Sequence, residues 1–506
     1  MKIKNTNFSK EYVINVYENL IDNAIINNKC HKVDKALKLL NIAARWMFNF
    51  NIIYSDCRID NLIIDISKKI LGDRKVYDKD DSCYVFIDSI LTDRCLAYQY
   101  LYALTKLNKH IVYIAHGKSF TNNPEVIKLL NEYCNSNIYF FKTSKSIIAD
   151  AIKINKIILS YKPTGIFLHL LPDDVLSLLS ICSISSVSIF NIDLQDHAFW
   201  IGSGLIDYNF IFRSYGENLS KTQRGLALEK LIRLPYFPIN YPNISFKGFP
   251  QLPQNAIRIF TGGSSYKMLG KQDVFFKIMD IILDCNNLAY ILIASTGDSS
   301  MLKTKIGLMK NSRRVILLGE RKDINEVYKH CDIFLSTYPR LGGLMTQYAA
   351  MNSLPIISYT MAEDVGYNVE CMVNHKFRSL KTFHTFEEIK EYASKLINNN
   401  KFRKSEGIKN KNAIITSDDF VSLLNKALTI YSTDLEWNED VIPNYEKIQD
   451  FYLENENKYL HTGLITIIRN LKLSVFRYIP TQTIAILQCL MLKSFEKLCR
   501  NLKNIL

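Results

Sequence analysis

Residues 332–357 read DIFLSTYPRLGGLMTQYAAMNSLPII, and this stretch decides the fold. It predicts a strand over 332–336, a loop closed by a glycine pair, a helix over 343–352 and a second strand over 355–359. A strand, a turn, a helix and another strand in that order form a βαβ unit, whose two strands run parallel. The stretch therefore predicts a parallel α/β domain.

The same order of elements extends toward the N-terminus of this stretch. Further strands are predicted at 257–260, 290–294 and 314–318, and further helices at 273–283, 299–310 and 323–330. Residues 254–430 thus form one predicted Rossmann-like domain.

A second domain with the same alternation precedes it. Runs of Val, Ile and Phe at 84–88, 111–115, 137–141, 165–170 and 187–190 are separated by amphipathic stretches. Uninterrupted apolar strands are typical of a parallel sheet that helices cover on both faces. We predict a second Rossmann-like domain over 82–240, and a joint where five prolines occur, namely Pro235, Pro238, Pro242, Pro250 and Pro253. A ligand cleft is expected between the domains.

Helical segments flank the two domains. Residues 1–81 carry apolar side chains at three- and four-residue spacing, which predicts a small helical bundle. Residues 431–506 are predicted to be a basic helical tail, and its part 458–506 holds eight Lys or Arg against one acid. Such a tail fits either an anionic membrane surface or packing on the protein itself. The predicted fold class is α/β, with two Rossmann-like domains between a helical segment and a helical tail.

Composition and charge narrow the function classes. The chain has 506 residues, 48% of them hydrophobic and 22% charged, which is typical of a globular protein. Its formal net charge of +14 favours anionic partners, although general Lys richness explains part of that excess. Nucleic-acid binding is not expected, because the basic residues are dispersed and no basic-aromatic motif recurs.

The cysteines and the N-terminus bear on localisation. The eleven cysteines form no C-x-x-C pair and no cluster with histidines at metal-ligand spacing, which favours a reducing compartment and argues against zinc. No signal peptide and no run of 18 apolar residues is found. We expect a cytoplasmic protein, peripheral at the inner face of the membrane if the tail binds lipid.

A glycine turn follows the first strand of the C-terminal domain. Gly262, Gly263 and Ser264 precede Lys267 in the run IFTGGSSYK, residues 259–267. Backbone N–H groups exposed by such a turn suit a diphosphate, and a lysine adds a charge-assisted contact. By itself a Gly-Gly turn after a strand is more often only a tight turn.

Together, the strand-loop-glycine-helix-strand order and the run RVILLGE at 314–320 resemble the donor-binding region of GT-B glycosyltransferases. The likeness covers roughly 256–400 and lies in order and spacing. It implies that Gly342, Gly343 and Thr346 contact the diphosphate of a nucleotide-sugar and that Glu320 lies near the nucleoside. No cofactor is expected beside that donor substrate.

One departure from the family bears on the reaction. Many retaining GT-B enzymes carry two glutamates eight residues apart around the glycine turn, whereas no Glu occurs between Asp332 and Asn352. The chain more closely resembles the O-GlcNAc-transferase-like and bacterial adhesin-glycosylating group, which inverts. Inverting, metal-independent transfer to a glycan, a lipid-linked glycan or a protein is therefore expected. The Asp78-Lys79-Asp80 sequence lies in a charged loop and not at a strand end.

An inverting transfer needs a general base. The block DHAFWIG at 196–202 follows the strand at 187–190 and resembles a recurring block of bacterial glycosyltransferase-like proteins. His197 is the candidate base or acceptor positioner, because imidazole titrates near neutral pH. Asp196 or Asp193 would orient it. A structural histidine beside an aromatic core is the alternative.

Two more residues are candidates for an acceptor or anion contact. His116 ends the strand at 111–115, and Arg213 lies downstream of the DHAFWIG block. The alternative for His116 is an ordinary strand-to-loop turn. His169 lies inside an apolar strand and is expected to be a core histidine.

Two other functions remain open. A nucleotide-sugar epimerase of the GT-B fold would need paired acids around the glycine turn, and these are missing. A non-catalytic, membrane-associated scaffold would account for the charge and the basic tail. A dehydrogenase is disfavoured, because neither half has G-x-G-x-x-G after its first strand.

Overall fold

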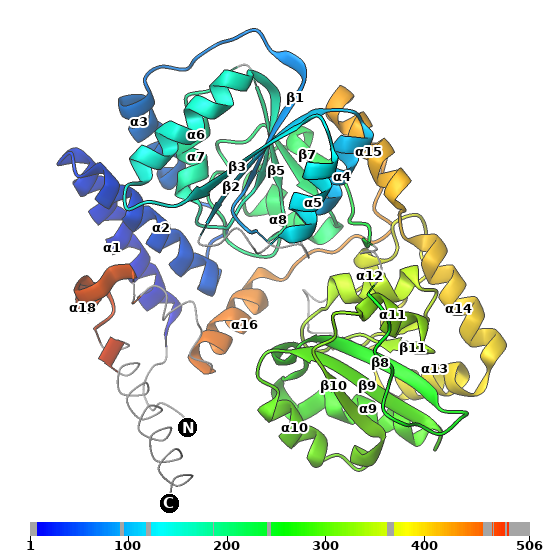
Figure 1. Cartoon of the computed structure of the whole chain (residues 1–506). Coiled ribbons are helices and arrows are strands. Elements are labelled where there is room, and N and C mark those ends of the chain that lie inside the picture. Colours follow the sequence, from blue (N-terminus) through cyan, green and yellow to red (C-terminus); the bar gives the residue numbers. More distant parts are fainter. Residues whose placement is uncertain are drawn as a thin grey trace, which may run out of the picture. The chain divides into compact units, whose positions relative to one another are not determined.

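The computed structural model describes residues 8–91, 96–117, 123–185, 187–239, 244–361, 369–458, 468, 470–480 and 483–484. The chain forms two compact units (Figure 1). The N-terminal unit comprises Met1–Phe210, Leu219–Ile232 and Asn444–Leu506, and the C-terminal unit comprises Ile211–Asn218 and Arg233–Pro443. The predicted fold class is confirmed, because each unit holds one largely parallel sheet with helices.

The N-terminal unit begins with three helices, as the apolar spacing predicts. They are α1 (Lys10–Lys29), α2 (Val33–Phe50) and α3 (Cys57–Leu71). The side chain of Ser9 caps α1 by accepting the N–H of Tyr12, and Asp56 caps α3 by accepting the N–H of Arg58. Their apolar faces bury Tyr17, among others, in the core that the sheet shares. The segment is therefore part of the N-terminal unit and not a separate bundle.

The sheet of this unit has seven strands in the order β3-β2-β1-β4-β5-β6-β7. The strands are β1 (Asp80–Asp88), β2 (His110–Gly117), β3 (Ser136–Lys142), β4 (Pro163–His169), β5 (Ser188–Ile192), β6 (Tyr208–Ile211) and β7 (Leu231–Arg233). The helices are α4 (Leu96–Lys106), α5 (Pro124–Glu132), α6 (Ile147–Tyr161), α7 (Val175–Ile181) and α8 (Ser214–Thr222). Pairing from β3 through β6 is parallel. Strands β6 and β7 were not predicted.

Both faces of this sheet are buried. Val85 and Ile87 face an aliphatic core shared with α1–α3, α6 and α7. On the other face Phe86 and Phe190 stack on Phe167, with ring centroids 6.0 and 5.2 Å away. Because neighbouring residues point to opposite faces, burial of both faces requires an uninterrupted apolar run.

The C-terminal unit has a five-stranded parallel sheet in the order β10-β9-β8-β11-β12. The strands are β8 (Ile257–Ser264), β9 (Ala289–Thr296), β10 (Val315–Gly319), β11 (Ile333–Leu335) and β12 (Ile356–Ile357). The helices are α9 (Val274–Asp284), α10 (Ser300–Gly307), α11 (Ile324–Lys329), α12 (Gly343–Met351), α13 (Phe386–Asn398), α14 (Asn400–Ala413) and α15 (Ser417–Ile430).

The predicted turn at 262–265 is wrong in one respect. Gly262, Gly263 and Ser264 pair in register with Ala294–Thr296 as the end of β8, and the chain turns only at Ser265. Gly263 has φ +141°, which glycine adopts without strain. Gly262 and Gly263 therefore belong to β8 and not to a turn after it.

Both sheets reverse strand order at one place. Connections leave β1 and β4 in opposite directions, and so do those of β8 and β11. Ligands of open α/β sheets bind beyond the carboxyl ends of strands at such a switch point. Each unit therefore has one expected ligand edge.

After the C-terminal unit the chain returns to the N-terminal unit. Helix α16 (Tyr445–Lys458) packs against α2, and Gln449 Nε2 donates to the carbonyl oxygen of Ile52 at 2.9 Å. Most of the basic part of the predicted tail, 458–506, lies outside the described residues. Of its described part, Leu471, Val475 and Ile479 are buried in the N-terminal core. Among the residues that the structure describes, no helix is long and apolar enough to cross a membrane.

Candidate functional site

Glycines line the switch point of the C-terminal unit. A Cβ atom at Gly262 would lie 2.8 Å from the carbonyl oxygen of Ala294, and one at Gly342 would lie 3.3 Å from Oγ1 of Thr337. The same Gly342 position lies 3.7 Å from the carbonyl oxygen of Gly262. The end of β8 and the loop after β11 therefore lie next to each other, and both have glycines without side chains at this place.

Side chains join the two predicted donor elements. Lys267 Nζ donates to the carbonyl oxygen of Leu341 at 3.0 Å, and the Arg340 N–H donates to the carbonyl oxygen of Lys267 at 3.3 Å. Gly342 is the N-cap of α12 and offers no side chain to the first N–H groups of that helix. The buried Thr346 hydroxyl donates to the carbonyl oxygen of Gly342 at 3.2 Å.

Two cations meet at this edge. Burial lowers the pKa of the Lys267 ammonium, and the positive charge of the neighbouring Arg340 lowers it further. Among the described residues Lys267 forms no ion pair with an acid, and the Arg340 guanidinium lies 5.1 Å from the centre of the Tyr266 ring. A buried lysine beside a second cation is stabilised by a bound anion.

Glu320 lies at the same edge of the sheet but farther along it. It follows Gly319, whose φ is +70°, at the end of β10, and its side chain is exposed. Strands β9 and β8 separate β10 from β11. Its predicted role near a nucleoside stays a prediction, as do those of Gly263, Ser264, Gly343 and Thr346.

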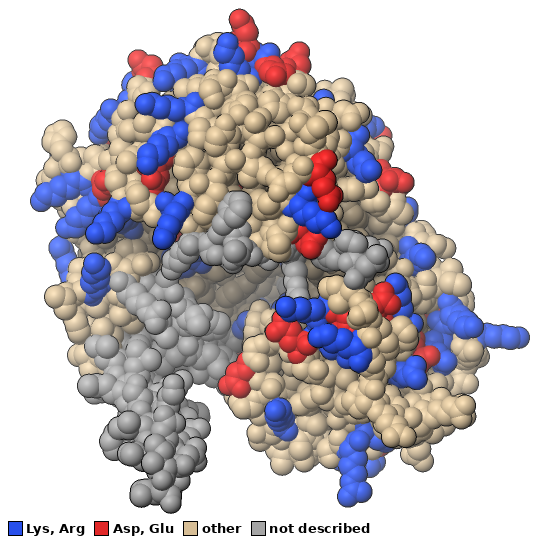
Figure 2. Space-filling view, viewed as in Figure 1, with Lys and Arg blue, Asp and Glu red and all other residues tan. Residues whose placement is uncertain are grey.

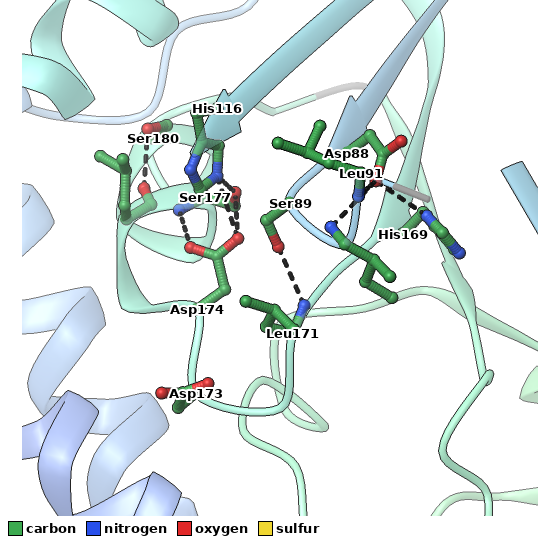
Figure 3. A network of polar contacts seen from close by, with 12 residues as sticks. Asp88, Ser89, Leu91, His116, His169, Leu171, Asp173, Asp174, Ser177 and Ser180 are labelled. Carbon is green, nitrogen blue, oxygen red and sulfur yellow. Dashed lines mark hydrogen bonds and ion pairs between the residues drawn. The ribbon is translucent and has the colours of Figure 1, made fainter. Parts of the chain in front are cut away.

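Buried polar pairs fill the ligand edge of the N-terminal unit (Figure 3). Asp88, at the end of β1, accepts from Tyr113 Oη at 2.7 Å and contacts His169 Nδ1 at 2.9 Å. Burial raises the pKa of Asp88, but the stronger opposing effect of His169 and these hydrogen bonds holds it below its usual value. His169 is fully buried, as expected of a core histidine.

His116 is buried beside this pair. Its Nε2 lies 3.0 Å from Asp174 Oδ2 and 2.7 Å from Ser177 Oγ (Figure 3). Asp174 also caps α7 by accepting the Ser177 N–H at 3.0 Å. The structure thus pairs His116 with an acid that was not predicted, and its role toward an acceptor stays a prediction.

This pair predicts a pH dependence of stability. Burial lowers the pKa of His116, but Asp174 overcomes that effect and raises it above 6.5, while the pKa of Asp174 falls to about 2. A raised histidine pKa stabilises the fold fully below pH 6.5, and this stabilisation is lost as the pH rises through the folded value. We expect the difference in unfolding free energy between the parent and His116→Gln, measured in urea, to be larger at pH 6 than at pH 9. His384→Gln, at an exposed site, is the control, and a difference independent of pH would contradict the assignment.

His197 lies on a loop after β5. Its Nδ1 is 3.4 Å from Oδ1 of the buried Asp196, at the long end of the hydrogen-bond range. Its ring lies parallel to that of Tyr452 in α16, with centroids 6.4 Å apart and planes 15° apart. The side chain is 45% exposed, so the alternative of a core histidine is disfavoured.

Three residues fix the backbone of this loop. Arg224 Nη2 donates to the carbonyl oxygens of Asp196 at 3.0 Å and Ala198 at 2.7 Å. Asp60 of α3 accepts the N–H groups of Gly202 and Gly204, both at 2.8 Å. Asn51 Oδ1, at the end of α2, accepts the Phe199 N–H at 2.6 Å. The helices of the N-terminal segment therefore hold the His197 loop.

Arg213 is the second residue predicted to contact an acceptor or anion. It belongs to Ile211–Asn218 of the C-terminal unit, and its guanidinium lies over the rings of Tyr215 and Phe212 at 4.7 and 5.2 Å. The side chain is buried. Its predicted anion contact stays a prediction.

Within the described ranges, no group of three His, Cys, Asp or Glu residues could hold a metal ion. On the face shown in Figure 2, Lys and Arg side chains are spread among Asp and Glu rather than gathered in one patch.

The comparisons with known proteins bear on the fold. No protein-family model and no curated protein matches the sequence. Among solved structures, a mutant of the Thermobaculum terrenum O-GlcNAc transferase is similar over 83% of this chain and 80% of its own, at 15% identity and a TM-score of 0.50.

Two further structures give a similar result. Anabaena HepE in complex with UDP and glucose matches 69% of this chain and 99% of its own, at 10% identity and a TM-score of 0.51. A Rickettsia africae glycosyltransferase matches 70% and 98%, at 13% identity and a TM-score of 0.51. Together with the two largely parallel sheets, these likenesses show that the chain has the GT-B fold of glycosyltransferases.

Proposed function

We propose that the chain transfers a sugar from a nucleotide-sugar, whose diphosphate binds at the glycine-lined edge of the C-terminal unit. One observation carries the proposal, namely that Lys267 and Arg340 meet beside the uncapped start of α12. Helix N–H groups and two cations together form an anion site, and the bare backbone of Gly262 and Gly342 lets phosphate oxygens approach. The UDP and glucose in the HepE structure make UDP-sugars the first donors to test.

Donor binding tests this proposal. We expect one class among UDP-, GDP-, CMP- and dTDP-sugars to raise the melting temperature. Lys267→Met should weaken that binding about 10- to 100-fold, the value of one charge-assisted hydrogen bond of ~1.5–3 kcal/mol. Lys310→Met, which removes a surface cation paired with Asp284, should bind like the parent. If no nucleotide-sugar binds the folded protein, the donor site is wrong.

We further propose inverting, metal-independent transfer with His197 as the general base, to a glycan, lipid-linked glycan or protein hydroxyl. A half-exposed imidazole beside a buried carboxylate has the arrangement that a general base needs. The absence of glutamate between Asp332 and Asn352 supports inversion. His197→Ala should bind donor with unchanged affinity and lose transfer, while normal turnover of that variant would exclude the role.

We also propose that the basic tail binds the protein peripherally to an anionic membrane surface on the cytoplasmic side. In its described part Leu473 is 85% exposed beside Lys472, and Phe476 is exposed beside Arg477. Apolar side chains that alternate with cations suit the interface of anionic lipids. Leu473→Glu should reduce sedimentation with phosphatidylserine vesicles, and Ile442→Glu, at an exposed site of the C-terminal unit, should not. Equal sedimentation of the two variants would refute this surface.

A further inference from the structure

Two loops of the C-terminal unit, one after β8 and one after β11, fix the backbone of Arg340 from both sides. The Arg340 N–H donates to the carbonyl oxygen of Lys267 at 3.3 Å. The carbonyl oxygen of Arg340 accepts from Oγ1 of the buried Thr337 at 2.7 Å. The preceding residue, Pro339, lies against Gly270, where an added Cβ would be 2.7 Å from Pro339 Cγ. The side chain of Arg340 therefore starts from a fixed point.

An exposed aromatic ring holds the other end of that side chain. The guanidinium carbon of Arg340 lies 5.1 Å from the centre of the Tyr266 ring, within the range in which a ring face attracts a cation. Tyr266 belongs to the turn directly after β8 and is 51% exposed, while Arg340 is partly buried. The ring therefore restricts where the guanidinium can lie.

This position brings Arg340 close to a second cation. The positive charge of Arg340 adds to burial in lowering the pKa of Lys267, so the two side chains repel each other. Lys267 is itself held, because its Nζ donates to the carbonyl oxygen of Leu341 at 3.0 Å. An anion beside the first N–H groups of α12, which no side chain caps, relieves the repulsion.

Holding the guanidinium in place also favours binding in another way. A free arginine side chain loses rotamer freedom when it contacts a ligand, and this loss weakens binding. Arg340 is already restricted by its fixed backbone and by the Tyr266 ring, so it loses less. Tyr266 can thus strengthen anion binding without touching the anion.

We propose that Tyr266 is a positioning residue of the diphosphate site, whose ring face holds the Arg340 guanidinium beside Lys267 for contact with the diphosphate. Identifying this anion as the diphosphate of a sugar donor rests on the proposed function. The binding of a diphosphate anion, and the dependence of that binding on Tyr266, do not rest on it.

Isothermal titration calorimetry of the full chain with inorganic pyrophosphate tests this role. Tyr266→Leu, which removes the ring, should weaken binding about two- to fivefold, the value of one exposed cation–π contact. Tyr266→Phe keeps the ring face and should restore the affinity lost in Tyr266→Leu. Phe377→Leu is the matched control, because it removes another exposed aromatic ring of the same unit, and it should bind like the parent.

A double-mutant cycle tests whether Tyr266 acts through Arg340. Adding Tyr266→Leu to Arg340→Met should cause no further loss of affinity, because no guanidinium remains to be held. A further two- to fivefold loss would mean that the ring contacts the anion directly and would overturn the positioning role. Equal affinities of Tyr266→Phe and Tyr266→Leu would overturn it as well. Where Arg340→Met does not bind pyrophosphate, the comparison of Tyr266→Phe with Tyr266→Leu decides.

The outcomes separate this inference from the proposed function. If nucleotide-sugars raise the melting temperature but Tyr266→Leu binds pyrophosphate like the parent, the donor site stands and the positioning role falls. If pyrophosphate binding depends on Tyr266 as expected and no nucleotide-sugar binds, the positioning role stands and the transferase proposal falls. If neither pyrophosphate nor any nucleotide-sugar binds the folded protein, both fall.

Discussion

Arg224→Met should lower the free energy of unfolding by about 3–5 kcal/mol, the usual result of removing one partner of a buried ion pair. The Arg224 side chain is fully buried, lies over the Trp200 ring at 5.0 Å and faces Asp193. Its loss leaves a buried carboxylate without its cation and frees the carbonyl oxygens of Asp196 and Ala198. Urea unfolding measures the change.

Two further variants test whether the stability lost in Arg224→Met comes from the buried ion pair. Lys69→Met breaks an exposed pair with Asp65 in the same unit and should cost less than about 1 kcal/mol. Adding Asp193→Asn to Arg224→Met should restore part of the lost stability, because the unpaired carboxylate is gone. An Arg224→Met protein as stable as Lys69→Met would show that the buried pair contributes little.

Gly407→Ala should be comparably destabilising, by about 3 kcal/mol or more. Gly407 lies in α14 where that helix meets the loop between α12 and β12, and an added Cβ would lie 1.8 Å from the carbonyl oxygen of Ser353. The clashing group is backbone, so no rotamer change relieves it, and α14 must move away from the loop between α12 and β12.

A second glycine gives the matched control for thermal unfolding. Gly307 ends α10, and a Cβ there meets nothing within 4 Å. Gly307→Ala should be neutral or stabilise by up to about 1 kcal/mol, since alanine favours helix. Similar melting temperatures for Gly407→Ala and Gly307→Ala would contradict the close packing of α14.

Most strands could be predicted because the sheets are buried on both faces. Strands β1 to β5 and β8 to β12 each contain or overlap a predicted apolar run. Strands β6 and β7 span only four and three residues, too few to show a period. The glycines at 262 and 263 predict a turn, because a sequence does not reveal that Ala294 and Met345 leave no room for a side chain at Gly262 or that Gly263 has a positive φ within the strand.

At the candidate sites, too, some contacts could be predicted from the sequence and others could not. The contact between Lys267 and Leu341 was foreseeable, because the ends of neighbouring parallel strands share one edge. The partner of His116 is 58 residues away, and Asp60 is 142 residues from Gly202. Such pairs depend on how helices pack on a sheet, which leaves no periodic pattern in a single sequence.

The chain passes from one unit to the other after residues 210, 218, 232 and 443. The C-terminal unit is thus, in effect, an insertion within the sequence of the N-terminal unit. One protease cut in the proline-rich stretch at 235–253 would leave the C-terminal unit joined at 443 to helix α16, which still packs against α2 of the N-terminal unit. Conversely, a stop codon after residue 443 would leave the C-terminal unit intact in sequence and remove Tyr452 from His197 and Gln449 from Ile52. Loss of the C-terminal residues would therefore remove contacts from the N-terminal unit, most of which is synthesised first.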